Sequence, residues 1–100
     1  MKMIYCTCNI SVLDELIEMM RSEKIDSYQV VEKVTGKDHA GDPRLNTSVW
    51  PGFNSSFTAM VKDEKVPKVV KMINDYNEKA INRNEIITFC SWNLQEYICE

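Results

Sequence analysis

The chain has 100 residues, of which 44% are hydrophobic and 27% are charged. This length is enough for one domain and too short for two, and the composition is that of an ordinary globular protein, not a disordered one. The net charge of −3, with lysines and arginines scattered among acidic residues, argues against nucleic-acid binding, because phosphate contacts require a basic face.

The sequence also gives no sign of a membrane span or a signal peptide. No segment approaches the roughly 18 consecutive apolar residues that a membrane helix needs. Residues 1–5 lead directly into a strand pattern, without the apolar core or small-residue cleavage site of a signal peptide. We therefore expect a single cytoplasmic domain over residues 1–100.

The first half of the chain predicts a strand, a helix and a second strand. Residues 3–10 are rich in β-forming residues and predict the first strand. Ser11 stands where an N-cap is expected, and Leu13, Leu16, Ile17 and Met20 follow at helical spacing. Residues 27–35 then predict a strand, with Tyr28, Val30 and Val34 on one face.

A long loop separates this half from the next three elements. Residues 36–54 hold all three glycines and two of the three prolines, and loops of this length are usually functional or disordered. Residues 55–61 predict a third strand, Pro67 marks the first turn of a second helix, and residues 85–92 predict the last strand.

This order predicts an α+β, ferredoxin-like βαββαβ sandwich, in which two helices cover one face of a four-stranded antiparallel sheet. Right-handed crossovers place the first and third strands in the centre. Two helices cannot cover both faces, yet the first strand is apolar on both, with Met3 and Tyr5 opposite Ile4 and Cys6. We expect self-association to cover the second face; the alternative is that residues 93–100 fold back over it.

Cys6 and Cys8 are the clearest metal-binding candidates. Residues i and i+2 of a strand share a face, so these two thiols could bind a soft metal ion such as copper(I) or zinc, with Cys90 on a neighbouring strand. The alternative is that both cysteines pack in the core as small hydrophobic residues.

The loop offers a second group of candidates. Lys37 and Arg44 could bind a phosphate, and Asp38, His39 and Asp42 could bind a divalent cation, although a polar, solvated loop would look the same. Trp50 and Phe53 flank a Pro-Gly turn and either anchor the loop or meet a ligand.

Motifs of known catalytic chemistry are absent from the sequence. It contains no GxSxG, P-loop, HExxH or dinucleotide-binding pattern, and the only histidine, His39, lies in the loop, far along the chain from every cysteine. We therefore expect a binding protein and not an enzyme.

At residues 28–57 the sequence resembles the PII-like branch of the PII-type nitrogen regulatory proteins. The similar segments are residues 28–37 (YQVVEKVTGK) and residues 44–54 (RLNTSVWPGFN), the second of which contains the Val-Trp-Pro-Gly-x-Asn stretch that leads into the third strand of that branch. The resemblance implies a homotrimer that binds small effectors, often adenine nucleotides, in clefts between subunits. It also implies that the loop contacts a regulated protein such as a membrane transporter.

By position, the resemblance places Gly36 and Lys37 at the base of that loop, and Trp50 and Asn54 near its return. With the loop side chains of His39 and Arg44, these are the expected ligand-binding residues. Nucleotide-binding members carry a glycine- and lysine-rich phosphate loop before the last strand, but residues 80–85 (AINRNE) contain no glycine and one basic residue, Arg83. The divalent-ion-tolerance proteins of the CutA type share the fold and resemble the run CTC at residues 6–8, which keeps metal handling as the alternative function.

Overall fold

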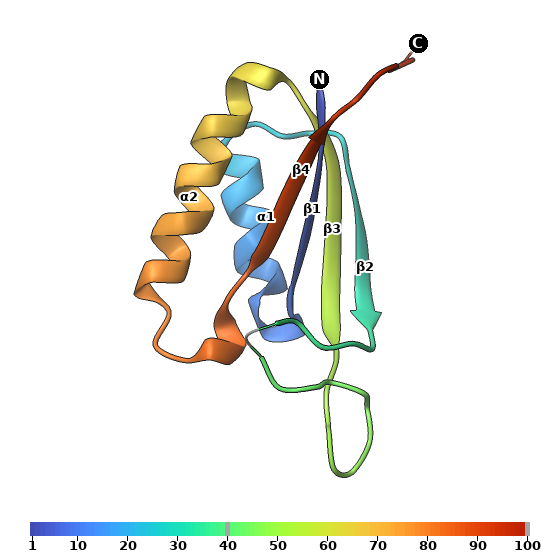
Figure 1. Ribbon diagram of the computed structural model, residues 1–100, viewed down its shortest axis with the longest axis vertical. Coiled ribbons are helices and arrows are strands. Elements are labelled where there is room, and N and C mark those ends of the chain that lie inside the picture. Colours follow the sequence, from blue (N-terminus) through green and yellow to red (C-terminus); the bar gives the residue numbers. More distant parts are fainter. Residues whose placement is uncertain (40, 100) are drawn as a thin grey trace.

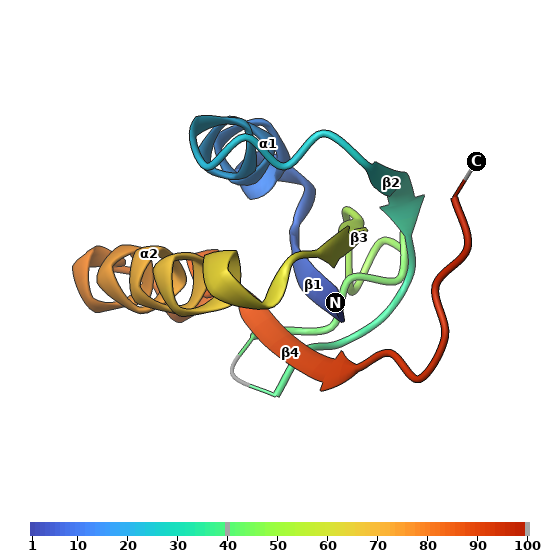
Figure 2. The same ribbon diagram turned by 90° about the horizontal axis from the view of Figure 1, so that it is seen from above.

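The computed structural model describes residues 1–39 and 41–99. Its elements are β1 (Lys2–Asn9), α1 (Leu13–Ser22), β2 (Tyr28–Val34), β3 (Asn54–Val61), α2 (Val66–Lys79) and β4 (Thr88–Asn93), with short 3-10 turns before α1, α2 and β4. The strands form an antiparallel sheet in the order β2-β3-β1-β4, and both helices lie on the same side of it (Figures 1 and 2). The predicted ferredoxin-like fold, with β1 and β3 in the centre, is confirmed.

The core lies between the helices and the covered face of the two central strands. Alternate residues of β1 and β3 point toward the helices, and all of them are 2% exposed or less: Ile4, Cys6, Cys8, Ser55, Phe57, Ala59 and Val61. The apolar stripes of the helices close over them, with Leu13, Leu16 and Met20 from α1 and Val66, Val69 and Ile73 from α2.

The start of α1 differs from the prediction. Asn9, and not Ser11, is the capping residue: its backbone is extended, and its Oδ1 accepts a hydrogen bond from the Ser11 N–H at 3.1 Å. The capped segment is a 3-10 turn, Ile10–Val12, which continues into α1. Pro67 lies in the first turn of α2, as predicted.

The last strand begins three residues later than predicted, at Thr88 instead of residue 85. The Asn77 side chain of α2 accounts for the delay, because its amide bonds to both the N–H and the carbonyl of Ile87, each at 2.9 Å. It thereby occupies the backbone groups that a strand partner would use. Residues Arg83–Glu85 form a 3-10 turn, η3, capped by Asn82.

The edge strand β2 contains an irregularity that the alternating pattern did not predict. The register with β3 shifts between Val31 and Val34, so Val34 does not continue the face of Tyr28 and Val30. The buried Ser55 hydroxyl donates a hydrogen bond to the Glu32 carbonyl at this irregularity. Tyr28 stacks on Phe57, with ring centroids 5.2 Å apart.

The opposite face of the sheet, which we call the open sheet face, carries apolar side chains that no described helix covers. Met3 lies between Met60 and Trp92 in the register, and Tyr5 lies between Thr58 and Cys90. The C-terminal segment follows β4 on this side (Figure 2), with the Leu94 N–H bonded to the Met1 carbonyl at 3.1 Å. It covers little, because Trp92 remains 50% exposed and Ile98 84% exposed.

Of the helices that the described residues form, none has the length and apolar character needed to cross a membrane.

Candidate functional site

The backbone divides the long loop into two parts. Gly36 and Arg44 form an isolated antiparallel bridge, in which the N–H of each donates to the carbonyl of the other at 2.9 Å. The described residues between them, 37–39 and 41–43, belong to a small closed turn beside the body of the protein. Residues 45–53, which we call the tip, lead into β3 and project beyond the point where that strand begins (Figure 1).

The Arg44 side chain fastens this loop to two other parts of the chain. Arg44 is only 6% exposed, and its Nη1 donates to Oδ1 of Asn54, the first residue of β3, at 2.5 Å. Its Nη2 donates to the backbone carbonyl and the Oδ1 of Asn84, at 3.0 and 3.2 Å. Arg44 therefore joins the loop to β3 and to η3 at once.

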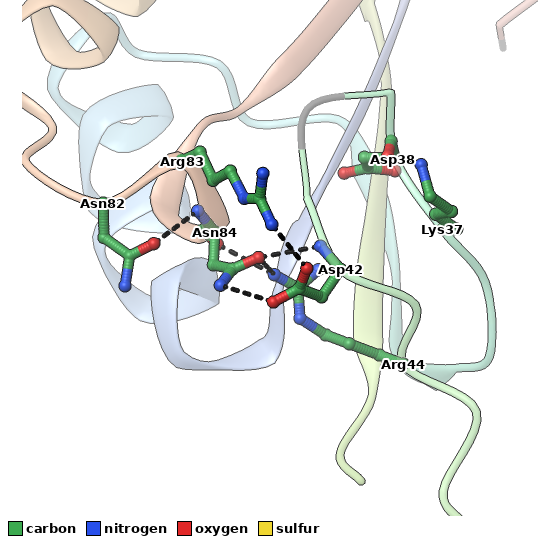
Figure 3. A network of polar contacts seen from close by, with 7 residues as sticks. All are labelled: Lys37, Asp38, Asp42, Arg44, Asn82, Arg83 and Asn84. Atoms are coloured by element: carbon green, nitrogen blue, oxygen red, sulfur yellow. Dashed lines mark hydrogen bonds and ion pairs between the residues drawn. The ribbon is translucent and has the colours of Figure 1, made fainter. Parts of the chain in front are cut away.

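Asp42 completes a polar network with the same turn (Figure 3). Its backbone N–H donates to Asn84 Oδ1 at 2.8 Å, and its carboxylate accepts from Asn84 Nδ2 at 3.2 Å and Arg83 Nη2 at 2.9 Å. The hydrogen bond from Asn84, assisted by the positive charge of Arg83, holds the pKa of the Asp42 carboxyl below its ordinary value. The network thus favours the charged carboxylate.

The other charged residues of the closed turn have separate environments. Asp38 accepts a hydrogen bond from the Thr7 hydroxyl at 2.8 Å, while Lys37 Nζ donates to the Asp38 carbonyl at 3.3 Å and His39 is exposed. Asp38 and Asp42 are therefore bonded to different donors. Among the described residues, no three His, Cys, Asp or Glu side chains come close enough to hold a metal ion, so this geometry does not favour the predicted divalent-cation site.

The tip is held in shape by its own hydrogen bonds. The Asn46 N–H donates to the Gly52 carbonyl at 3.1 Å, and Asn46 and Gly52 have φ angles of 55° and 88°, which suit these two residue types. The Trp50 N–H donates to the Thr47 hydroxyl at 2.9 Å. Val49 and Trp50 are left 73% and 41% exposed, so the tryptophan does not anchor the tip in the core.

A shallow groove of about 270 Å³ lies between the tip and the polar network. It is lined by Asn9, Asp42, Pro43, Arg44, Val49, Trp50, Pro51 and Asn84. One end therefore offers the polar atoms of the network and the other an aromatic ring. This combination of an apolar surface with a few placed polar groups is typical of small-molecule sites.

The structure brings four of the six predicted ligand-binding residues into this region. The bridge that closes the turn joins Gly36 to Arg44, and the hydrogen-bond network joins Arg44 to Asn54. The groove is lined by Trp50. Lys37 and His39 are exposed residues of the closed turn. Sequence reasoning missed Asn84, although the Asn82-x-Asn84 pattern of a capped turn was a signal for a fixed loop at this point.

The cysteines do not favour the predicted soft-metal site. Cys6 and Cys8 are fully buried under the helices, and burial raises the pKa of the Cys6 thiol to about 12 and that of the Cys8 thiol to about 11. Metals bind the thiolate, which this environment disfavours. Cys90 pairs with Tyr5 in the register and so belongs to the opposite face of the sheet. The arrangement matches the alternative, in which both buried cysteines pack as small hydrophobic residues.

Comparison with known proteins gives a clear result at the level of structure alone. No family model and no curated protein matches this sequence. A protein from Thermus thermophilus, assigned to PII-like signalling, superposes with a TM-score of 0.66 at 13% identity, over 93% of this chain and 85% of the other. CPII of Thiomonas intermedia K12, a nitrogen regulatory PII-like protein bound to ADP, AMP and bicarbonate, superposes with a TM-score of 0.69 at 11% identity, over 95% of this chain and 88% of its own.

The chain has the PII-like fold. The same protein, CPII, bound to ADP and bicarbonate gives a TM-score of 0.68 at 12% identity, over 95% and 88% of the two chains. The resemblance to PII-like proteins that residues 28–57 predicted is confirmed in the fold.

Proposed function

We propose that this protein is a PII-like regulator that binds a small effector and signals to a partner protein through the 36–54 loop. The observation that carries the proposal is the network around Arg44, which joins that loop to β3 and to η3 within the PII-like fold. A ligand that rearranges the network acts directly on the loop.

The effector class that fits this site is an adenine nucleotide or a small anion such as bicarbonate. Arg83 is the exposed cation of the network, with 69% of its side chain accessible, and an anionic group would compete with Asp42 for it. Trp50 at the other end of the groove offers a face on which a base can stack. CPII, which shares the fold, binds ADP, AMP and bicarbonate.

Residues 80–85 bear on which nucleotide would bind. They contain no glycine, so η3 replaces the flexible phosphate loop of nucleotide-binding members, and fewer backbone N–H groups are available to a triphosphate. We therefore expect an effector with one or two phosphates, or bicarbonate, to bind more tightly than ATP.

Signalling follows from a competition between two sets of contacts. An effector shifts the loop only if it interacts better with one loop arrangement than with the other. An anion bound to Arg83 would weaken the Asp42 contact, and the closed turn and the tip would then move relative to the body. Val49 and Trp50 at the tip are the apolar side chains that a partner, such as a membrane transporter, would contact.

The proposal includes a homotrimer of single-domain protomers in the cytoplasm. The groove of one protomer is open and, at about 270 Å³, smaller than a typical pocket of roughly 300–1,000 Å³. A neighbouring subunit packed on the open sheet face would complete it. The metal-handling alternative has no such support, because its cysteines are buried.

Isothermal titration calorimetry with ATP, ADP, AMP, cyclic nucleotides and bicarbonate tests the proposal. We expect binding of at least one of these, weakened about tenfold or more in Arg83→Ala. Arg21→Ala is the matched control, since Arg21 is an exposed arginine on α1 that pairs with Glu18. Absence of heat with every ligand, or equal binding by both variants, would contradict the proposed site.

A further inference from the structure

A second groove, unrelated to the first, lies between α1 and α2. Its volume is about 550 Å³, and it shares no residue with the Arg44 network or the tip. The two helices run beside each other on the far side of the molecule from the open sheet face (Figure 2). The groove is therefore available on a protomer whose open sheet face is covered.

The floor of this groove is apolar and adaptable. Met19 of α1 and Met72 and Tyr76 of α2 are half-buried and pack against the core beneath. Methionine side chains are flexible and polarizable, and they suit surfaces that accept another protein's apolar residues. Burial, together with the nearby Glu15 carboxylate, raises the pKa of the Tyr76 hydroxyl to about 12, so the floor stays uncharged.

The two walls of the groove carry opposite charge. The α1 wall has two carboxylates, Glu15 and Glu23, which gives a charge of −2. The α2 wall has three lysines and one aspartate, which gives +2: Lys68, Lys71, Lys79 and Asp75. Lys71 and Asp75 pair with each other at 2.7 Å, so Lys68 and Lys79, which form no ion pair with a described residue, are the lysines of this wall that can meet a ligand.

We propose that this groove binds an amphipathic helix of a partner protein, with its apolar stripe on the methionine floor, a basic flank facing α1 and an acidic flank facing α2. Helix-in-groove binding of this kind is a common mode of recognition. The walls are 10 and 14 residues long. At about 1.5 Å per residue they match a partner helix of roughly three to four turns.

Other occupants fit the groove less well. An anionic lipid surface would meet the carboxylates of the α1 wall as well as the lysines. A second copy of this chain lacks a suitable apolar stripe, because among the described residues of α1 and α2 the most exposed large hydrophobic side chain is Val70, at only 36%. The charge pattern therefore selects a helix with one basic and one acidic flank.

Three labelled 14-residue helical peptides test the proposal, by fluorescence anisotropy at low salt. All share a leucine stripe at helical spacing; one has a lysine flank and a glutamate flank, one has two lysine flanks, and one has two glutamate flanks. We expect the mixed-flank peptide to bind wild type at least tenfold more tightly than either of the others. Reversing its direction in the groove also exchanges its flanks, so one of the two chain directions always places the lysine flank against α1 and the glutamate flank against α2.

Charge reversal on the protein provides the decisive variant. Lys68→Glu with Lys79→Glu makes both walls acidic, and we expect the preference to move to the peptide with two lysine flanks. Lys33→Glu with Lys62→Glu changes the net charge equally outside the groove and should leave the preference unchanged. Circular dichroism checks that each variant is folded. Met72→Glu should abolish binding of all three peptides.

Several results would overturn the proposal. Equal binding of the three peptides by wild type, no binding of any, or no change of preference in Lys68→Glu with Lys79→Glu would each do so. Binding of phosphatidylglycerol vesicles through the same two lysines would assign the groove to a membrane surface instead. If the protein self-associates and only Lys68→Glu with Lys79→Glu abolishes that self-association, the groove would be assigned to a second copy of the chain. None of these results depends on effector binding or on the 36–54 loop.

Discussion

Arg44 is the residue on which the loop architecture depends most. It is a buried cation whose partners are the Asn54 amide oxygen and two oxygens of Asn84, residues 10 and 40 positions away in the chain. A guanidinium can reach all three because it presents several N–H donors in a fixed plane. A buried donor or acceptor that loses its partner costs about 1–3 kcal/mol, so this side chain is a sensitive point.

We therefore expect Arg44→Lys to destabilise the protein by about 2 kcal/mol, because one ammonium cannot satisfy both asparagines. The urea unfolding midpoint, compared with that of Arg21→Lys, measures the effect. Arg21 is exposed, and its substitution should change stability by less than about 0.5 kcal/mol. Equal midpoints for the two variants would show that Arg44 does not fasten the loop.

The four free cysteines differ in exposure, since Cys6 and Cys8 are buried and Cys90 and Cys99 are exposed. Iodoacetamide at neutral pH should modify Cys99 in the native protein and leave Cys6 and Cys8 unmodified, which peptide mass spectrometry will show. Because the thiol pKa values of Cys8 and Cys6 are raised on folding to about 11 and about 12, the stability they contribute is present below the ordinary thiol pKa and is lost as pH rises through these folded values. Rapid native labelling of Cys6 or Cys8 would contradict their burial.

At the scale of elements, alternation and helical spacing predicted each helix and strand, because the covered face of the sheet and the helix stripes are set by burial alone. The errors lie where a side chain replaces a backbone partner. Asn77 delays β4 by bonding to Ile87, and Ser55 bonds to the Glu32 carbonyl at the irregularity in β2. Such contacts leave no periodic trace in the sequence, so the strand limits could not be read from it.

Asn77→Ala tests the first of these contacts. It leaves the N–H and the carbonyl of Ile87 without partners next to a buried side chain, and we expect a loss of roughly 2 kcal/mol in the free energy of unfolding. Asn74→Ala, on the exposed face of the same helix, is the control. Chemical denaturation would contradict this account if the two variants were equally stable.

The contact between the closed turn and η3 should respond to acid. The pKa of Asp42 is lowered in the folded protein, so the stability that its charged form contributes is present above the ordinary Asp pKa of about 4 and disappears as pH falls through the lower folded value. Asp42→Asn should therefore lose less stability than wild type between pH 7 and pH 3. Urea midpoints at both pH values measure this difference.

Asp26→Asn serves as the control for the acid response, because Asp26 is an exposed residue outside the network. It should show the wild-type acid response. If Asp42→Asn were as acid-sensitive as Asp26→Asn, the Asp42 carboxylate would not contribute to holding the loop against η3.

For the whole molecule, the sequence predicted the topology and part of the site, for different reasons. Burial determined the topology, whereas Gly36, Arg44, Trp50 and Asn54 came from the loop composition and the resemblance to PII-like proteins. Asn84 could not be found in this way, because its contact with Arg44 depends on how distant segments meet in the fold. The two grooves could not be predicted for the same reason, since each is lined by segments that only the folded chain brings together.

The open sheet face connects the fold to the proposed function. Met3, Met60 and Trp92 form an apolar row there, and Tyr5 and Cys90 lie beside it. Apolar patches of this kind usually mark an interface. We propose that three copies pack through this face with their grooves at subunit boundaries, so that the effector site is shared between neighbours.

Sedimentation velocity at micromolar concentration tests that arrangement most directly. We predict a species of about 35 kDa, three times the 11.6 kDa of one chain, that Trp92→Asp on the open face dissociates, because an added carboxylate there would be buried without a partner. A single 11.6 kDa species for the wild-type protein would contradict the shared site and the regulatory role built on it.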